Sequence, residues 1–239
     1  MNEFYVVIPS RLDSKRLARK ALALIDGKPL IQWVYHRAIA SKAKSVIIAT
    51  DSDEIASVAR SFGAIVELTN EDHKSGTDRI FEVCDRLNWD DDQVVVNLQG
   101  DNPLMPPENI NQIAQMMNDC DIATLSAPIQ DHEIIDPNVV KVSTDPSSND
   151  ALFFKRNINS GDFKKNLGRH IGIYAYNVAS LKRFSLSPQS EDEKKEKLEQ
   201  LRAYSLDMRI KVEEAQLIPG PDVDTQDDLK LVQSILQND

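Results

Sequence analysis

The sequence predicts a three-layer α/β/α fold with a mainly parallel, Rossmann-like sheet and an antiparallel extension. Up to about residue 127, short β-branched runs alternate with helix-like segments. This spacing is typical of a parallel sheet with helices on both faces. After about residue 130 the strand-like runs follow one another with little helix between them. The chain is therefore expected to change from parallel to antiparallel pairing part-way along.

The first part of the chain supplies the parallel strands and the helices that connect them. The strands are expected at residues 4–8, 45–49, 64–68, 93–97 and 122–127. The helices are expected at residues 29–41, 54–62, 77–87 and 107–118. Pro29 suits the first position of a helix, and the polar residues 50–53 suit the cap of the next one.

The second part is expected to be mainly antiparallel. Its strands are expected at residues 139–144, 151–156, 170–176 and 210–214, with helices at 191–205 and from about 225. We interpret residues 1–239 as one domain, in which about 130–210 form an antiparallel and helical extension. This extension would be a substrate lid, a dimer surface or both.

Composition excludes several classes of partner. The 239 residues carry a net charge of −10, whereas binding to nucleic acid or to an anionic membrane normally needs a basic face. Cys84 and Cys120 are the only cysteines, which indicates a reducing, cytoplasmic compartment. The apolar run near the N-terminus has only five residues, too few for a signal peptide or a membrane span.

A cluster of basic side chains follows the first expected strand. Its members are Arg11, Lys15, Arg16, Arg19 and Lys20. Ligands of open α/β sheets bind beyond the carboxyl ends of the strands, and such cations can neutralise a triphosphate. The segment lacks both the Walker A glycines and a G-x-G-x-x-G pattern, so side chains and a metal would have to hold the phosphate. The alternative is a solvated basic loop.

Two aspartates are candidate metal ligands. Asp101 follows a buried strand, directly after Gly100, which would leave room for a ligand to approach closely. Mg²⁺ prefers oxygen ligands and often uses one or two carboxylates together with phosphate oxygens. From the residues alone, Asp101 could equally cap a helix or turn, and Asp224 could cap the last helix. Asp222 is a weaker neighbour of the second candidate.

Several motifs along the chain resemble those of one enzyme family. They are I-P-S-R-x-x-S-x-R-L-x-x-K from residue 8, G-K-P-L-I at 27–31, A-T-D at 49–51, D-H-K-S-G-T-D-R at 72–79, N-L-Q-G-D-N-P at 97–103, P-N-V-V-K-V at 137–142, A-L-F-F-K-R at 151–156, R-H-I-G-I-Y-A-Y at 169–176, K-L-E-Q-L-R at 197–202 and V-D-T-Q-D-D-L at 223–229. In this order they resemble the 3-deoxy-manno-octulosonate (Kdo) cytidylyltransferases, which make CMP-Kdo for lipopolysaccharide. The resemblance runs almost end to end and implies the nucleotide-diphospho-sugar transferase type of α/β fold.

The resemblance also implies a reaction and a set of site residues. The anomeric hydroxyl of a sugar acid would attack the α-phosphorus of CTP with Mg²⁺ present, and pyrophosphate would leave. The implied catalytic residues are Arg11, Arg16, Lys20 and Asp101, with Asp101 and Asp224 as metal ligands. The implied CTP-binding residues are Pro9, Ser10, Arg11, Ser14, Lys20, Ser75, Gly76 and Arg79. The implied sugar-binding residues are Gln99, Arg156, His170, Tyr174, Glu199 and Gln200. A homodimer is also implied.

Most of these residues also have a plain structural interpretation. Residues 72–79 could form a polar loop with Thr77 as a helix cap and His73 at the surface. His170 could be a satisfied histidine at a strand end, and Tyr174 could belong to the core. Glu199 could be one more charge on a solvated helix, because residues 191–200 are rich in both signs.

The sequence departs from the family pattern in two places. Where the family normally reads R-L-P-G-K-P-L, this chain reads R-L-A-R-K-A-L at residues 16–22, so both prolines and the glycine are absent. Arg19 replaces that glycine and would contact phosphate or point into solvent. After Arg156 the chain continues with the polar residues 157–162 in place of an apolar and aromatic run, and Lys155 stands where a small serine is common.

Three acceptors and two rival functions therefore stay open. The acceptor could be Kdo, an 8-amino form of it or another ulosonic acid. One rival function is a CMP-nonulosonate (sialic-like) synthetase. The other rival is a nucleotide-binding regulatory paralogue with weak catalysis, suggested by the altered loop.

Overall fold

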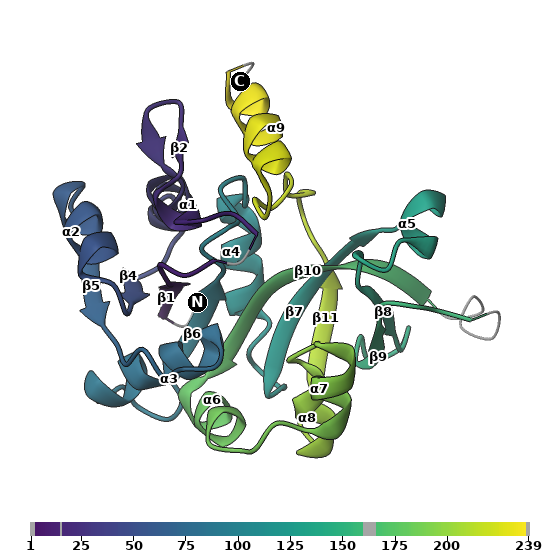
Figure 1. The fold of residues 1–239 in the computed structure, drawn as a ribbon. Helices are drawn as coiled ribbons and strands as arrows, with labels where there is room; N and C mark the ends of the chain where they lie inside the picture. The colour runs from purple at the N-terminus through teal and green to yellow at the C-terminus, as the bar shows by residue number, and fades with distance from the viewer. Residues whose placement is uncertain (1–2, 15, 160–165, 238–239) are drawn as a thin grey trace.

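One sheet runs through the centre of the protein in the computed structural model (Figure 1). The structure describes residues 3–14, 16–159 and 166–237, and within these ranges nine strands join the sheet. The strand order is β11-β7-β10-β6-β1-β4-β5, with β8 paired to β10 and β9 paired to β8. Two parts of the predicted site lie outside the described residues. One is Lys15 of the basic cluster, and the other is residues 160–165, which include the end of the altered segment after Arg156.

The parallel pairing predicted for the first part of the chain is confirmed for four strands, whereas the fifth, expected at residues 122–127, is separated from them by an antiparallel strand. The four strands are β1 (Phe4–Ser10), β4 (Ser45–Thr50), β5 (Ile65–Leu68) and β6 (Val94–Leu98). The helices of this part are α1 (Leu30–Ile39), α2 (Asp53–Ser61), α3 (Gly76–Arg86) and α4 (Pro107–Gln115). Strand β1 pairs in parallel with β4 and β6, so the loops that follow β1 and β6 leave the sheet at the same edge.

The antiparallel part is built around one long strand. Strand β10 (Asn166–Asn177) runs antiparallel to β6, β7 (Ile122–Pro128) and β8 (Lys141–Thr144). Strand β9 (Ala151–Lys155) pairs antiparallel with β8, and β11 (Ile210–Glu214) pairs in parallel with β7. The described part of the predicted extension is therefore continuous with the main sheet.

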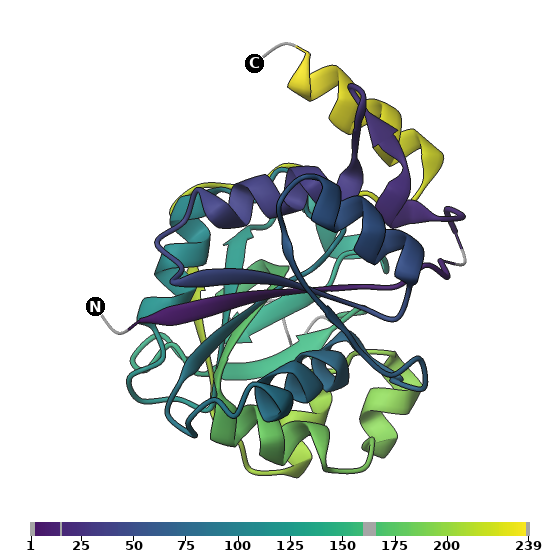
Figure 2. The ribbon, with the colours of Figure 1, turned by 90° about the vertical axis from the view of Figure 1, so that its left-hand side faces the viewer.

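Helices cover both faces of the sheet, as Figure 2 shows. Apolar side chains of α1, α2 and α4 form one core, and those of α3, α6 (Val178–Ser185) and α8 (Leu201–Ser205) form the core on the opposite face. A third, smaller core lies between the hairpin of β2 (Leu24–Ile25) and β3 (Lys28–Pro29) and the C-terminal helix α9 (Gln226–Leu236). Val223 belongs to this third core, and so the segment just before α9 is anchored there.

Both cysteines are free, and Cys84 is fully buried on α3. Burial raises the pKa of the Cys84 thiol to about 12 and that of Cys120 to about 11. Because the thiolate is the reactive form, we expect both thiols to react more slowly than an exposed cysteine at neutral pH.

The expectation of one helix over residues 191–205 is wrong. Two short helices occur there, α7 (Glu191–Glu196) and α8. Lys197 ends α7 in the left-handed conformation, with φ 54°, and Leu198 then turns into the core. The short helix α5 (Asp131–Ile135) and helix α6 are not among the predicted elements.

A buried ion pair holds the two short helices together. The guanidinium of Arg202 on α8 donates to both carboxylate oxygens of Glu193 on α7, at 2.8 and 2.6 Å. Both side chains are less than 5% exposed, at 3% and 4%. The guanidinium also lies 4.5 Å from the ring centre of Phe184 on α6. A charge pair with this many contacts fixes one arrangement of α7 against α8.

Candidate active site

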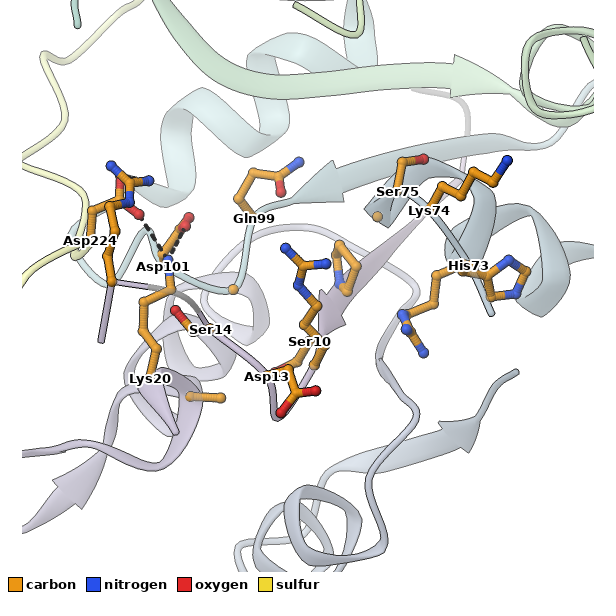
Figure 3. A pocket seen from close by; sticks show the side chains of 17 residues that line it. Ser10, Asp13, Ser14, Lys20, His73, Lys74, Ser75, Gln99, Asp101 and Asp224 are labelled. Atoms are coloured by element: carbon orange, nitrogen blue, oxygen red, sulfur yellow. Dashed lines mark hydrogen bonds and ion pairs between the residues drawn. The ribbon is translucent and has the colours of Figure 1, made fainter. Parts of the chain in front are cut away.

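A polar cavity of about 380 Å³ opens where the loops after β1 and β6 meet the start of α3. Figure 3 shows its lining from close by. The lining residues are Pro9, Ser10, Arg11, Asp13, Ser14, Arg16, Lys20, Ala21, His73, Lys74, Ser75, Gly76, Arg79, Gln99, Gly100, Asp101 and Asp224. This cavity brings together the predicted catalytic, CTP-binding and metal-binding residues, together with Gln99 from the predicted sugar set.

Two glycines let the walls of the cavity close on one another. A Cβ at Gly100 would lie 2.9 Å from the backbone oxygen of Pro9, and a Cβ at Gly76 would lie 3.0 Å from the Pro9 ring. Gly100 thus makes room for the end of β1, which is a different role from the close approach of a ligand expected from the sequence. The end of β1, the β6 loop and the start of α3 are in consequence packed directly against each other.

Lys20 joins two carboxylates that are far apart in the sequence. Its ammonium donates to Asp101 at 2.7 Å and to Asp224 at 3.0 Å (Figure 3). Arg16 also contacts Asp224, at 2.8 Å. The backbone supports this meeting, because the amide of Val223 donates to the carbonyl of Asp101 at 2.9 Å. Burial disfavours the charged ammonium, but the two carboxylates outweigh this and raise the pKa of Lys20.

Neither aspartate caps a helix through its side chain. Thr225 is the N-cap of α9, with Asp228 completing a capping box, and α4 begins after Pro106 without a side-chain cap. The alternative in which Asp224 caps the last helix is therefore wrong, and Asp101 does not cap α4 but lies in the turn after β6.

The donor chemistry of this pair fits a small divalent cation. Asp101 and Asp224 already place oxygens around one shared positive charge. Within the described ranges there is no group of three or more His, Cys, Asp or Glu side chains that could hold a metal ion. A metal bound here would thus take its remaining ligands from phosphate and water, which is the usual way that Mg²⁺ binds.

The start of α3 forms the opposite wall of the cavity. Ser75 caps this helix by accepting from the amide of Asp78 at 3.1 Å, and the helix begins at Gly76. The alternative in which Thr77 is the cap is therefore wrong. The positive end of the α3 dipole faces the cavity, where it favours a negatively charged or carbonyl-bearing ligand.

The loop before α3 contributes two side chains that were not predicted as site residues. Lys74 and His73 both line the cavity. The ring of His73 pairs with Glu82, about two turns into α3, so this histidine is partly buried and is not a free surface residue. Lys74 adds a cation to the nucleotide side, and its place in D-H-K-S-G-T-D-R was the signal that could have identified it.

Arg79 on α3 contacts the end of β4 and the loop that precedes α3. Its guanidinium donates to Asp51 at the end of β4, at 2.5 Å, and to the hydroxyl of Thr69. The side chain is 4% exposed, yet the residue still contributes to the cavity wall. These contacts indicate that Arg79 fixes the position of Ser75 and Gly76.

The other predicted sugar-binding residues lie beyond this cavity. His170 contacts the hydroxyl of Thr124 at 2.9 Å, and its ring lies 5.5 Å from that of Tyr174. Desolvation lowers the pKa of His170 to about 3 and raises that of Tyr174, so both are neutral at pH 7. Glu199 is not on a solvated helix: it lies between α7 and α8 and accepts from Thr77 at 3.0 Å. Gln200 is buried beside it.

Arg156 is held at the end of β9 by backbone oxygens. Its guanidinium donates to the carbonyls of Pro137 and Glu196, at 3.2 and 3.3 Å. Its own carbonyl accepts from Lys141, a fully buried lysine whose ammonium also donates to the backbone carbonyls of Asp136 and Val139. Sequence reasoning passed over Lys141, although a charged residue inside the expected strand 139–144 was a visible signal.

Comparisons with known proteins identify the family of this chain. A profile described as cytidylyltransferase matches residues 5–210. The 3-deoxy-manno-octulosonate cytidylyltransferase of Thioalkalivibrio sulfidiphilus is 44% identical over 250 residues, covering 98% of this chain and 99% of that protein. The protein of the same name from Francisella tularensis subsp. holarctica is 45% identical, with the same 98% and 99% covered. This chain belongs to the 3-deoxy-manno-octulosonate cytidylyltransferase family.

Solved structures agree with membership of this family. A structure of CMP:2-keto-3-deoxy-manno-octonic acid synthetase complexed with CTP superposes with a TM-score of 0.90 at 36% identity, covering 99% of both chains. A 4-diphosphocytidyl-2C-methyl-D-erythritol synthase reaches a TM-score of 0.68 at 10% identity, and this likeness concerns the fold alone. In the described ranges, no helix has the length and apolar character needed to cross a membrane.

Arg19 is where this chain departs from the family loop. It adopts φ 55° and ψ 35°, the left-handed conformation that glycine takes without strain. Its guanidinium pairs with Glu54 on α2. Arg19 is not among the residues that line the cavity, and its side chain is 59% exposed, so it points largely into solvent, one of the two expected positions, while it pairs with a protein carboxylate.

We predict that Arg19→Gly is more stable than Arg19→Ala. Both variants lose the pairing with Glu54, but only alanine has to keep a Cβ in the left-handed conformation, which costs roughly 1–2 kcal/mol. The greater flexibility of glycine in the unfolded chain removes part of this, so a difference of about 1 kcal/mol is expected in urea unfolding. A clearly more stable alanine variant would contradict the backbone interpretation.

Proposed function

We propose that this chain transfers the cytidylyl group of CTP to the anomeric hydroxyl of Kdo or a Kdo-like 3-deoxy-ulosonic acid and releases pyrophosphate. The observation that carries the proposal is the convergence of Arg11, Arg16 and Lys20 with Asp101 and Asp224 in one cavity. The near full-length similarity to enzymes named for this reaction supports it. The free and protonated cysteines support a cytoplasmic location.

The cavity suits an in-line displacement at phosphorus. The acceptor oxygen forms the new bond to the α-phosphorus of CTP, its proton passes to solvent water, and the bond to the pyrophosphate oxygen breaks with its electron pair leaving on pyrophosphate. In the proposed arrangement the cations of the β1 loop bind the departing phosphates, while Ser75 and Gly76 at the start of α3 receive the cytosine. Such catalysis depends mainly on positioning and on neutralisation of charge.

Asp101 and Asp224 would hold Mg²⁺. When bound, the metal would neutralise phosphate charge and favour deprotonation of the acceptor hydroxyl. Lys20 contacts both carboxylates, at 2.7 and 3.0 Å, so a metal held by the same two aspartates would compete with its ammonium for their oxygens.

The acceptor is tested by product analysis. Purified protein is incubated with CTP, Mg²⁺ and, separately, Kdo, 8-amino-Kdo and a nonulosonic acid, and the products are identified by mass spectrometry. We expect a CMP-octulosonate. A clean CMP-nonulosonate without any CMP-octulosonate would favour the sialic-like rival. Measurable CTP binding without pyrophosphate release, with every acceptor, would favour the regulatory paralogue.

We predict that Asp101→Ala lowers turnover by at least about a hundredfold while the thermal midpoint changes little, because one metal-binding carboxylate is lost at an edge of the core. The matched control is Asp227→Ala, which removes an exposed carboxylate three residues after Asp224. A chelator should likewise stop the wild-type reaction, and added Mg²⁺ should restore it. Near-normal activity of Asp101→Ala would remove this residue from the metal site.

We also propose a homodimer, as the family resemblance implies. The antiparallel extension offers the surface for it, because β9 pairs with a single strand and Leu152 on it is 49% exposed. Light scattering at micromolar protein concentration measures the mass directly. A mass of one chain under these conditions would rule the dimer out.

A further inference from the structure

Asn97 is a polar residue in an apolar place. It lies on β6, a central strand between β1 and β10, and is 1% exposed. Val95, two residues earlier and therefore on the same face of the strand, is a fully buried core residue. A buried amide on such a strand has to be explained by what its two ends contact.

The oxygen end of Asn97 contacts a residue of the cavity. Its Oδ1 accepts from Nε2 of Gln99 at 3.0 Å. Gln99 lines the cavity, and Figure 3 shows it between Asp101 and Ser75. Because one N–H of Nε2 donates to Asn97, the Gln99 amide is held in one orientation, in which its Oε1 can accept a hydrogen bond from a ligand.

The nitrogen end of Asn97 is not satisfied. Within the described residues, Nδ2 of Asn97 is buried and has no hydrogen-bond partner. An orphaned donor of this kind destabilises a fold, whereas an apolar side chain of similar shape at the same place can be neutral or stabilising. Folding therefore does not explain the asparagine, and its contact with Gln99 is the remaining reason for it.

The surroundings of Asn97 are those of the proposed acceptor pocket. Tyr174 on β10 is directly opposite Asn97, and side chains opposite each other on neighbouring strands share a face of the sheet. The charge of Glu199 contributes to the raised pKa of Tyr174, which places that carboxylate near the same face. Oε1 of Glu199 is a second buried polar atom without a hydrogen-bond partner among the described residues, although it lies 3.8 Å from the guanidinium of Arg202. Polar atoms with unused hydrogen-bonding capacity thus lie on the side where a polyhydroxylated acid would bind.

We propose that Asn97 is a positioning residue for the sugar acid, acting through Gln99. By accepting from Nε2, it fixes the Gln99 amide with its oxygen towards the ligand, where it accepts from a hydroxyl or ammonium group of the acceptor. This inference rests on the proposed function, because it requires a sugar acid at Gln99.

The test compares two Asn→Leu variants of equal burial. Asn97→Leu removes the hydrogen bond to Gln99 together with the orphaned donor. We expect a KM for the acceptor acid at least about tenfold higher, a KM for CTP within about twofold of wild type, and an unfolding midpoint that is unchanged or higher. The control is Asn109→Leu, because Asn109 is also fully buried but bonds Leu217 through both ends, at 2.7 and 3.1 Å. It should lose stability and leave both KM values unchanged.

A double-mutant cycle with Gln99→Leu shows whether Asn97 acts through Gln99. We expect Asn97→Leu to raise the acceptor KM in the wild-type background and to add less than about twofold when Gln99 is already leucine. Asn97→Asp, which keeps an acceptor atom facing Gln99, should recover part of the acceptor KM.

Two results would overturn the inference. The first is an Asn97→Leu variant that loses stability but keeps the wild-type KM for the acceptor. The second is an Asn97→Leu change that raises the acceptor KM by the same factor in the Gln99→Leu background as in the wild type. Failure of the proposed function is separate from both. It would appear as a wild-type protein that makes no CMP-octulosonate, and the cycle would then be measured with whichever acid of the panel is the acceptor.

Discussion

The active site depends on one ammonium group shared by two carboxylates. Lys20 comes from the loop after β1, Asp101 from the loop after β6 and Asp224 from the segment before α9, and their meeting gives the cavity its shape. The strand order makes this meeting possible, because β1 and β6 are parallel neighbours whose loops open at the same edge. The backbone bond from Val223 to Asp101 and the small core around Val223 bring the third segment to the same place.

The sequence predicted most of the parallel half because its signals are local. Buried β-branched runs, a proline before α1 and polar caps each act within a few residues, and the boundaries found there agree closely with those expected. The basic cluster after β1 was recognisable for the same reason, because its cations lie within the ten residues from Arg11 to Lys20. For Asp101 and Asp224, the expected metal-binding roles came only from the resemblance of the whole chain to a family. The residues around each aspartate look like those around an ordinary helix or turn cap.

What sequence reasoning missed depends on contacts between distant residues. The break at Lys197 follows from the burial of Leu198 and from the pairing of Glu193 with Arg202, and no local propensity reports either of them. The contact of Arg19 with Glu54 joins residues 35 positions apart. In the sequence, Asn97 looked like part of an ordinary strand. Its proposed role depends on two contacts that only the structure gives: Oδ1 accepts from Gln99, and Nδ2 has no hydrogen-bond partner among the described residues.

The two cysteines have a practical consequence for following the protein in solution. Burial raises the pKa of the Cys120 thiol to about 11, so its thiolate is rarer at pH 7 than that of a free cysteine. Maleimide reagents attack the thiolate, so both native side chains should react more slowly than an exposed cysteine. A single cysteine placed on an exposed position of the nucleotide loop could then carry a fluorophore without a cysteine-free background. Fluorescence from this loop could then be followed while CTP is added.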